Sequence, residues 1–260
     1  MPGWDANLYM KFAGQRGRPA ADLVAQIALD HPRRVIDLGC GTGNSTEQLR
    51  QRWPHAEVTG LDSSPDMLAQ ARANHPDWNW VEAKAEDWEP QHKEQYDLIF
   101  SNACLHWIGD HGHLFPRLFS YVAPGGAFAV QMPNSYHLPA HTVMHDVASD
   151  PRAPWSELLA GVTETYSVRP IAFYYDTLRK QASRLNIWQT EYLQIMDGPE
   201  AVLEWVTSTA MRRFTEPLPN DEMRKEFRQH VLERIQLMYP PNDQGKSLFP
   251  YFRLFVIAYR

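Results

Sequence analysis

A glycine-rich turn between a buried strand and a helix is the feature that most restricts the fold of this chain. The run DLGCGTG, residues 37–43, follows the apolar segment 35–38 and precedes a helix-like segment, 45–53. Glycines permit positive φ and let a ligand approach the backbone closely. A strand, a glycine turn and a helix in this order predict a parallel α/β unit with a ligand at the turn.

Short apolar runs and helix-like segments continue to alternate up to about residue 133, which is typical of a parallel sheet covered by helices. Ser64 and Pro65 predict the start of the helix after the second strand, because serine caps helices and proline needs no N–H partner at the first position. Further strands are predicted at 58–62, 80–83, 96–102 and 127–132, a helix at 114–122, and a turn at 124–126.

The second half of the chain shows a looser pattern. A helix is predicted at 173–182, strands at 186–196 and 252–259, and two helices between those strands, at 200–211 and 221–239. Two helices are too much material for a hairpin loop, so they indicate a helical cap. We expect a single domain over residues 1–260, with an N-terminal cap segment at 1–32, a cofactor-binding core at 33–133, and the remaining core strands and a helical substrate cap at 134–260.

Composition excludes several classes of protein. The formal net charge of −6 argues against a protein that coats nucleic acid, because such proteins carry a basic surface. The two cysteines, Cys40 and Cys104, have no short-spaced metal-ligand partner, which disfavours zinc and disulfide frameworks. The chain starts without a basic and apolar leader and has no long apolar run. We therefore expect a cytoplasmic protein that binds no metal, nucleic acid or membrane.

Asp62 ends the second predicted strand, about 20 residues beyond the glycine turn. A carboxylate at that place can accept hydrogen bonds from both hydroxyls of a ribose. The turn and the acid together therefore predict a nucleoside site. The spacing G-x-G-x-G differs from the dinucleotide fingerprint G-x-G-x-x-G, and no Walker lysine follows it.

Four segments resemble, in order, the motifs of class I S-adenosylmethionine-dependent methyltransferases: VIDLGCGTG, GLDSS, DLIFSNACLHW and LFSYVAPGGAFAV. The resemblance implies a Rossmann-like α/β fold with a mostly parallel seven-stranded sheet, helices on both faces and a helical cap. It also implies S-adenosylmethionine as cofactor and S-adenosylhomocysteine as product.

By this resemblance the glycine turn approaches the aminoacyl part of the cofactor, Asp62 holds the ribose, and Met67 packs against adenine. Asn102 is expected near the methionine moiety. Lys84 stands where the family commonly has an acid for the adenine amino group, and Glu86 or Asp87 is expected to replace it. The complete set expected at the cofactor is Asp37, Gly39, Cys40, Gly41, Asp62, Ser63, Met67, Glu86, Asp87, Asn102 and Leu105.

Further segments are similar to the trans-aconitate 2-methyltransferase family: an N-terminal W-x-x-x-x-Y-x-x-F, SNACLHW, AVQMPN and LFPYFRLFVIA. These segments extend over nearly the whole chain. The family activity that they imply is esterification of a small tricarboxylate, giving the monomethyl ester of trans-aconitate and S-adenosylhomocysteine.

An acceptor carboxylate is ionised at neutral pH and can attack a sulfonium methyl without a general base. The protein then has to align the reacting atoms and hold the other carboxylates, a task suited to arginine. We therefore assign no catalytic acid or base. His106 is expected either to orient the acceptor or to be a hydrogen-bonded wall residue, and not to act as a base. The residues expected at the acceptor are Arg16, Arg18, His106, Trp107, Gln131, Arg169, Tyr174, Tyr175, Arg212 and Arg253.

Three alternatives stay open. The chain is also compatible with a methyltransferase for another small or carrier-bound carboxylate, or for a phenol or amine, and a phenol would require a base. A nucleotide-binding protein without catalysis is the second, because a fold alone does not establish a reaction. A nicotinamide oxidoreductase is the third, and the turn spacing disfavours it. The expected partner is a small-molecule carboxylate, with no obligate protein partner.

Overall fold

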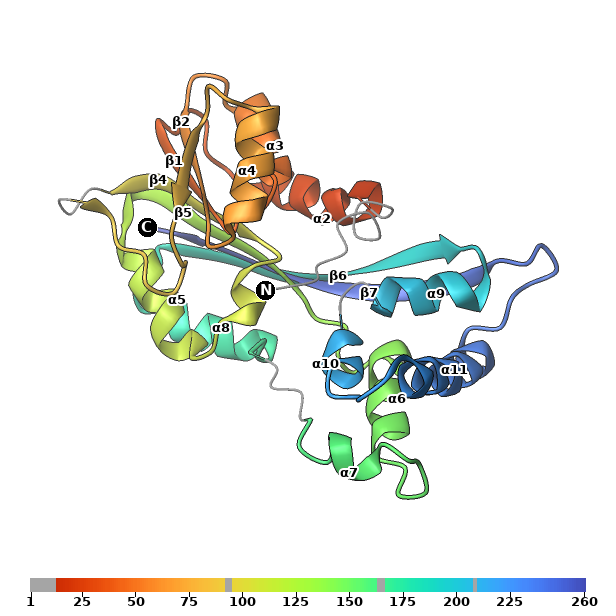
Figure 1. Cartoon of the computed structure of the whole chain (residues 1–260). Coiled ribbons are helices and arrows are strands. Elements are labelled where there is room, and N and C mark those ends of the chain that lie inside the picture. The colour runs from red at the N-terminus through yellow and green to blue at the C-terminus, as the bar shows by residue number, and fades with distance from the viewer. Residues whose placement is uncertain (1–12, 92–94, 163–166, 208–209) are drawn as a thin grey trace. The chain divides into compact units, whose positions relative to one another are not determined.

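A seven-stranded sheet organises the computed structural model, which describes residues 13–91, 95–162, 167–207 and 210–260 (Figure 1). The strand order is β3-β2-β1-β4-β5-β7-β6. The first five strands of this order pair in parallel and β7 pairs antiparallel to β5, which confirms the mostly parallel sheet. The strands are β1 (Arg34–Leu38), β2 (Glu57–Asp62), β3 (Asn79–Glu82), β4 (Tyr96–Asn102), β5 (Val122–Pro133), β6 (Arg184–Met196) and β7 (Ser247–Tyr259).

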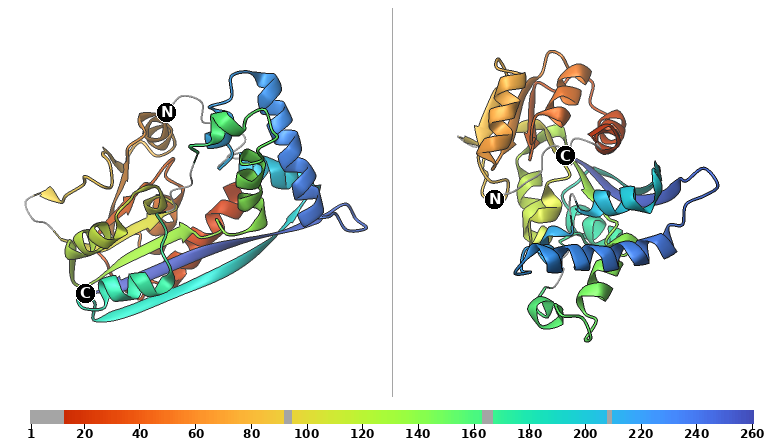
Figure 2. Two further views of the ribbon diagram at one scale, coloured as in Figure 1. Left: turned by 90° about the horizontal axis from the view of Figure 1, so that it is seen from below. Right: turned by 45° about the vertical axis from the view of Figure 1, so that its right-hand side comes forward.

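The chain forms two compact units. The first, called the sheet unit here, comprises the described residues within Gly14–Pro133, Tyr166–Thr190 and Arg253–Arg260. The second, the helical unit, consists mainly of those within Asn134–Thr165 and Glu191–Phe252. β6 and β7 contribute residues to both units and run side by side in both views of Figure 2. The single domain expected over residues 1–260 stays a prediction.

In the sheet unit, α3 (Asn44–Arg52) and α4 (Pro65–Asn74) pack beside β2 and β3 (Figure 1). Ser64 caps α4 by accepting a hydrogen bond from the Met67 amide at 3.4 Å, with Pro65 at the first helical position, as predicted. α5 (His111–Ser120) packs against α8 (Ile171–Leu178) and β5. Apolar side chains from these elements form one buried cluster, which includes Phe115, Phe128 and Leu178. α2 (Ala13–Gln26) belongs to this unit from Gly14 onward.

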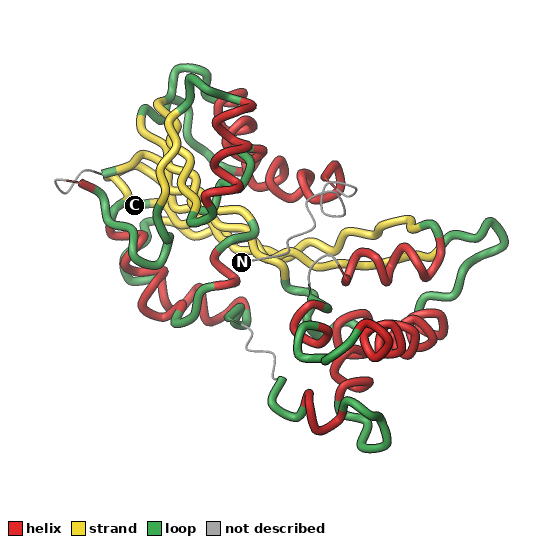
Figure 3. The backbone as a smooth tube through the Cα atoms, in the orientation of Figure 1, coloured by secondary structure: helices red, strands yellow, loops and turns green. Residues whose placement is uncertain are grey.

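In the helical unit, α6 (Pro139–Ala148), α9 (Gly198–Thr207) and α11 (Asp221–Met238) pack against one another (Figure 3). The short helices α7 (Ser156–Leu159) and α10 (Arg212–Thr215) belong to the same unit. Trp155 and Phe214 both contact the Phe227 ring of α11, at centroid distances of 5.3 and 5.9 Å. This unit therefore has an aromatic core of its own.

The structure differs from the sequence-based prediction in several elements. The sequence pattern does not predict the helices α2, α6, α7 and α10, although α6 starts at Pro139, as helices often do. The turn expected at 124–126 lies inside β5, where Gly125 has a φ of 79° and the pairing with β4 is irregular between Tyr96 and Leu98. Gly125 adopts this positive φ without strain because glycine has no Cβ. Within the described part of the chain, no helix combines the length and apolar character that a membrane crossing requires.

Candidate active site

The glycine turn is held against the second strand by two backbone hydrogen bonds. The amides of Gly39 and Cys40 both donate to the Leu61 carbonyl, at 2.7 and 3.0 Å. Gly39, Gly41 and Gly43 have positive φ values of 76°, 57° and 95°, which explains the three glycines. A Cβ placed on Gly41 would meet no atom within 4 Å. The backbone at Gly41 therefore lies beside open space and is accessible to a ligand.

Asp62 joins this turn to the start of α4. Its Oδ2 accepts a hydrogen bond from the Gly41 amide at 2.9 Å, and its Oδ1 accepts one from the Ser64 amide at 2.8 Å. Each carboxylate oxygen has a further lone pair, so the half-buried Asp62 retains capacity for hydroxyl donors. The residues present therefore fit a ribose at the end of β2, as the sequence predicts.

Asp37 is fully buried one step before the turn. Its Oδ2 accepts hydrogen bonds from the hydroxyls of Ser45 and Thr46, each at 2.7 Å. Burial raises the pKa of Asp37 to about 6, against the lowering effect of these two hydrogen bonds. The carboxylate thus ties the end of β1 to the first turn of α3, and its contact with a cofactor stays a prediction.

Two residues that the sequence analysis did not assign shape the same turn. Cys104 follows β4 and lies against Gly39, where a Cβ would come within 2.3 Å of the cysteine Sγ. The Trp80 ring covers Gly43 and Gly60, at 2.7 and 2.4 Å from Cβ atoms placed there. Burial raises the pKa of the Cys104 thiol well above its usual value, so the thiol is neutral. The glycines in the sequence indicate close packing at the turn, but they do not reveal that Cys104 and Trp80 are the packing partners.

The residues predicted at adenine lie in the first turn of α4 and after β3. Met67 is half-buried, whereas Lys84, Glu86 and Asp87 are exposed. The charge of Glu86 contributes to the raised pKa of the Cys104 thiol, after burial and the charges of Asp62 and Asp37. That Glu86 or Asp87 replaces the acid that the family commonly has at Lys84 stays a prediction.

The carboxyl ends of β4 and β5 bring three polar side chains to one edge of the sheet, of which Gln131 and His106 are buried and Asn102 is half-buried. Asn102 pairs with Gln131 in the parallel register, and the Ala103 amide donates to the Gln131 carbonyl at 3.0 Å. Ala103 has a φ of 51°, an unfavourable conformation for alanine that redirects the chain toward His106. Among the described residues, the buried Asn102 Oδ1, His106 Nδ1 and Gln131 Nε2 have no hydrogen-bond partner.

His106 is neutral at physiological pH. Burial, and after it the positive charge of Arg253, lower the pKa of its imidazole to about 3. Arg253 lies on β7 opposite Pro133 of β5 and is half-buried. Such a histidine is a poor proton acceptor, and its role at the acceptor site stays a prediction. Its free ring nitrogen is suited to a hydrogen bond with a bound molecule.

Comparisons with known proteins identify relatives of this chain among methyltransferases. A family model described as a methyltransferase domain matches residues 35–126. A trans-aconitate 2-methyltransferase from Azoarcus sp. (strain BH72) is 42% identical over 260 residues, covering 100% of both chains. The chain belongs to the trans-aconitate 2-methyltransferase family.

Two further members of this family are similarly close. The trans-aconitate 2-methyltransferase of Rhodopseudomonas palustris (strain BisB18) is 45% identical over 259 residues, covering 99% of both chains. The one from Escherichia coli O1:K1 / APEC is 41% identical over 266 residues, covering 100% of this chain and 99% of the relative.

Solved structures share the fold at low sequence identity. A putative methyltransferase from Bacillus halodurans C-125 has a TM-score of 0.59 at 14% identity, covering 93% of this chain and 98% of that one. A phosphoethanolamine N-methyltransferase 2 from Haemonchus contortus, solved with S-adenosyl-L-methionine, has a TM-score of 0.54 at 16% identity, covering 93% and 52%. These likenesses support the class I methyltransferase fold of this trans-aconitate 2-methyltransferase family member.

Other residues predicted at the acceptor are distributed differently. Trp107 and Tyr175 are 62% and 53% exposed, and Arg169 is exposed. Arg18 is exposed and lies 3.9 Å from Asp22, while the side chain of Arg16 lies outside the described residues. Arg212 belongs to the helical unit, where its Nε donates to Glu216 at 3.0 Å. The acceptor contacts of these residues stay predictions.

Tyr174 is also predicted at the acceptor, as a neutral donor, and this contact stays a prediction. Its side chain is fully buried, and its hydroxyl lies 2.8 Å from Nδ1 of His111. The same hydroxyl accepts the Arg169 amide at 3.0 Å. The periodicity of α8 gave no sign of this, because His111 precedes Tyr174 by more than sixty residues in the chain.

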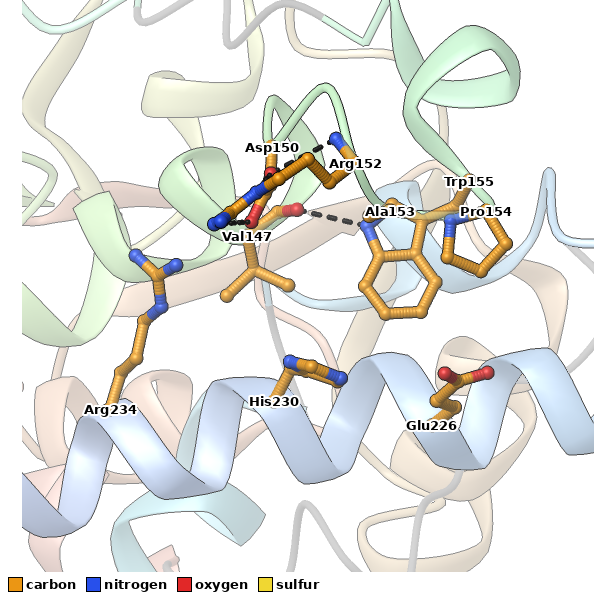
Figure 4. Close-up of a pocket in the computed structure, with 9 residues that line it drawn as sticks. All are labelled: Val147, Asp150, Arg152, Ala153, Pro154, Trp155, Glu226, His230 and Arg234. Atoms are coloured by element: carbon orange, nitrogen blue, oxygen red, sulfur yellow. Dashed lines mark hydrogen bonds and ion pairs between the residues drawn. The ribbon is translucent and has the colours of Figure 1, made fainter.

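A separate pocket of about 370 Å³ lies in the helical unit, between α11 and the loop 150–155 (Figure 4). Glu226, His230 and Arg234 line one wall, and Trp155 lies opposite, with its indole nitrogen donating to the Val147 carbonyl at 2.8 Å. None of the residues predicted from the sequence lines this pocket. Within the described ranges, no cluster of three or more His, Cys, Asp or Glu side chains is suited to hold a metal ion.

Proposed function

We propose that this chain transfers a methyl group from S-adenosylmethionine to a carboxylate of trans-aconitate, producing the monomethyl ester and S-adenosylhomocysteine. Membership in a family whose relatives carry the name trans-aconitate 2-methyltransferase supports the reaction. The glycine turn and Asp62 fit the cofactor, because Gly41 lies beside open space and Asp62 retains lone pairs.

The observation that carries the proposal is the set of unpaired polar atoms at the ends of β4 and β5. Asn102 Oδ1, His106 Nδ1 and Gln131 Nε2 are buried and, among described residues, have no hydrogen-bond partner. Burying such atoms is unfavourable unless a bound molecule pairs with them. Carboxylate oxygens meet this need at Gln131 Nε2 and at His106 Nδ1 when that nitrogen carries the proton, whereas an apolar acceptor would leave both unpaired. The Asn102 amide oxygen needs a donor instead, which the amino group of the cofactor would supply.

The electrostatics of the site favour an anionic acceptor. Arg253 is close enough to help depress the pKa of His106, so its positive charge reaches the space around that ring. A guanidinium binds a carboxylate through two parallel hydrogen bonds. We propose that Arg253 holds one of the acceptor's carboxylates while Gln131 donates to another oxygen.

The chemistry needs alignment and no proton transfer by the protein. When bound, S-adenosylmethionine supplies a sulfonium methyl that an ionised carboxylate attacks, with the carbon–sulfur electron pair leaving on sulfur. The neutral His106, with a pKa of about 3, orients the acceptor without competing for a proton. Positioning of this kind accounts for a large part of the barrier reduction in two-substrate reactions.

The deciding experiment measures methyl transfer from labelled S-adenosylmethionine to a panel of acceptors. The panel contains trans-aconitate, cis-aconitate, isocitrate, citrate, malonyl carrier protein and a simple phenol. We expect preferential labelling of trans-aconitate as a base-labile ester. Preference for another acid would retain the methyltransferase and replace the acceptor, and binding of the cofactor without any transfer would contradict the proposal.

A pair of variants tests the site itself. Gln131→Leu removes one of the unpaired polar groups at nearly constant volume, so we expect the acceptor KM to rise about tenfold, as for a lost hydrogen bond to a charged group. Gln181→Leu changes an exposed glutamine after α8 and serves as the matched control. Equal acceptor KM values for the two variants would remove Gln131 from the site. The cytoplasmic location and the absence of an obligate protein partner stay predictions.

A further inference from the structure

A buried hydrogen-bond network lies next to the proposed acceptor site. His111, the first residue of α5, is 3% exposed. Its Nε2 lies 3.0 Å from the Leu105 carbonyl oxygen, and its Nδ1 lies 2.8 Å from the Tyr174 hydroxyl. The Tyr174 oxygen also accepts the backbone N–H of Arg169 at 3.0 Å. All four residues belong to the sheet unit.

The chemistry of the partners sets the direction of each bond. A carbonyl oxygen only accepts, so Nε2 of His111 carries the proton and donates to Leu105. In the neutral ring Nδ1 then has a lone pair, and it accepts the hydroxyl proton of Tyr174. Burial lowers the pKa of His111, which keeps the ring in this neutral form. The Tyr174 hydroxyl therefore donates once and accepts once.

Both ends of this network attach to segments that the proposed function uses. Leu105 begins the 3-10 turn Leu105–Trp107, which carries His106. Arg169 lies just before α8, and its guanidinium is 5.8 Å from the Phe173 ring. One tyrosine hydroxyl thus connects the backbone beside His106 to the backbone of a cation expected at the acceptor.

We propose that Tyr174 and His111 are positioning residues for methyl transfer. They hold the backbone segments of His106 and Arg169 in place without touching the acceptor. This inference rests on the proposed function of the site. Loss of the hydroxyl would leave the buried Nδ1 of His111 and the partly buried Arg169 amide without these partners. The segments would shift to find other partners, and small displacements of positioning groups lower reaction rates strongly.

Tyr174→Phe is a clean deletion of the hydroxyl. The ring packs against Phe115 and Phe173, with centroid distances of 4.9 and 5.4 Å, and these contacts do not involve the oxygen. Tyr121→Phe is the matched control, because Tyr121 lies at the opposite end of α5 and packs edge-on against Trp88. Both variants lose one hydroxyl from the sheet unit.

The kinetic measurement separates positioning from stability. With cofactor saturating, we expect kcat/KM for the acceptor to fall about tenfold or more in Tyr174→Phe and to stay within about twofold in Tyr121→Phe. The Kd of S-adenosylhomocysteine should be unchanged in both. A lower Tm with unchanged acceptor kinetics in Tyr174→Phe would reduce the network to a structural role and overturn the inference.

A second measurement does not depend on activity. Long-range nitrogen–proton NMR of the wild-type protein should show His111 as the neutral tautomer protonated at Nε2 between about pH 6 and 8. An Nδ1-protonated ring, or ordinary titration near the usual histidine pKa, would contradict the network. A wild type that methylates no acid of the panel refutes the proposed function, and the inference with it. An active wild type with normal kinetics in Tyr174→Phe refutes the inference alone.

Discussion

Cys104 lies directly against Gly39, so closely that a Cβ on the glycine would come within 2.3 Å of both Cβ and Sγ of the cysteine. Real Cβ atoms do not approach other heavy atoms at such a distance. β1 and β4 pair in the sheet, so the turn after β1 and the segment after β4 leave the sheet side by side. Cys104 then packs on the glycine turn. This contact packs the glycine turn directly against the residues that follow Asn102.

Gly39→Ala and Gly41→Ala should therefore fail in different ways. In Gly39→Ala the clash and the positive φ together should lower the free energy of unfolding by about 2–4 kcal/mol. Cys104→Ala should not rescue it, because the Cβ of residue 104 remains. Gly41→Ala meets no atom within 4 Å, so it should cost only about 1–2 kcal/mol, yet weaken cofactor binding. Urea unfolding and calorimetric titration with S-adenosylhomocysteine measure both effects, and equal destabilisation of the two variants would contradict the contact.

Asp62→Ala should weaken binding of S-adenosylhomocysteine by about 1.5–3 kcal/mol, the typical cost of losing hydrogen bonds to a charged group. The Gly41 and Ser64 amides also lose their acceptor in this variant. Asp66→Ala, which changes an exposed acid in the first turn of α4, is the matched control. Isothermal titration calorimetry gives both affinities. Unchanged affinity in Asp62→Ala would refute the ribose assignment.

Asp37 should make the folded protein less stable as the pH rises from about 4 to 6. Burial raises its pKa from 3.8 to about 6, so in this window the folded state binds a proton that the unfolded state has released. Linkage then predicts a loss of about 3 kcal/mol across the window, complete above the folded-state pKa. Asp37→Asn has no such titration. The wild type should therefore lose stability relative to the variant as the pH rises from about 4 to 6. Urea unfolding at several pH values measures this, and a pH-independent difference would be the contrary result.

Arg253→Gln should raise the acceptor KM by about tenfold or more while the Kd of the cofactor product stays constant. The same change should raise the pKa of His106, because after burial the charge of Arg253 is the next largest cause of its lowering. Arg179→Gln, an exposed arginine that pairs with Asp176, is the control. Steady-state kinetics and histidine NMR report the two effects. An unchanged His106 titration would show that the guanidinium does not reach the ring.

Local sequence was sufficient for the elements of the cofactor half. β1, β2 and β4 are short apolar runs, and the helix starts at Asn44 and Pro65 are set by a glycine and by the Ser64 cap. The glycine turn and the place of Asp62 at the end of β2 could be predicted because they depend on backbone conformation and on neighbours close in the chain, whereas their contacts with the cofactor stay predictions. The family resemblance then supplied the cofactor and the acceptor class, which periodicity does not contain.

Only the tertiary structure decided which side chains meet across long stretches of chain. Tyr174 carries a polar group that suits an acceptor site, yet packing buries it beside His111. The depressed pKa of His106 likewise depends on burial and on Arg253, which comes from the last strand. Burial and long-range charge depend on how the strands and helices pack and not on local residue pattern. The sequence therefore determined the type of fold and the cofactor turn, and packing determined which of the predicted polar residues are free to contact an acceptor.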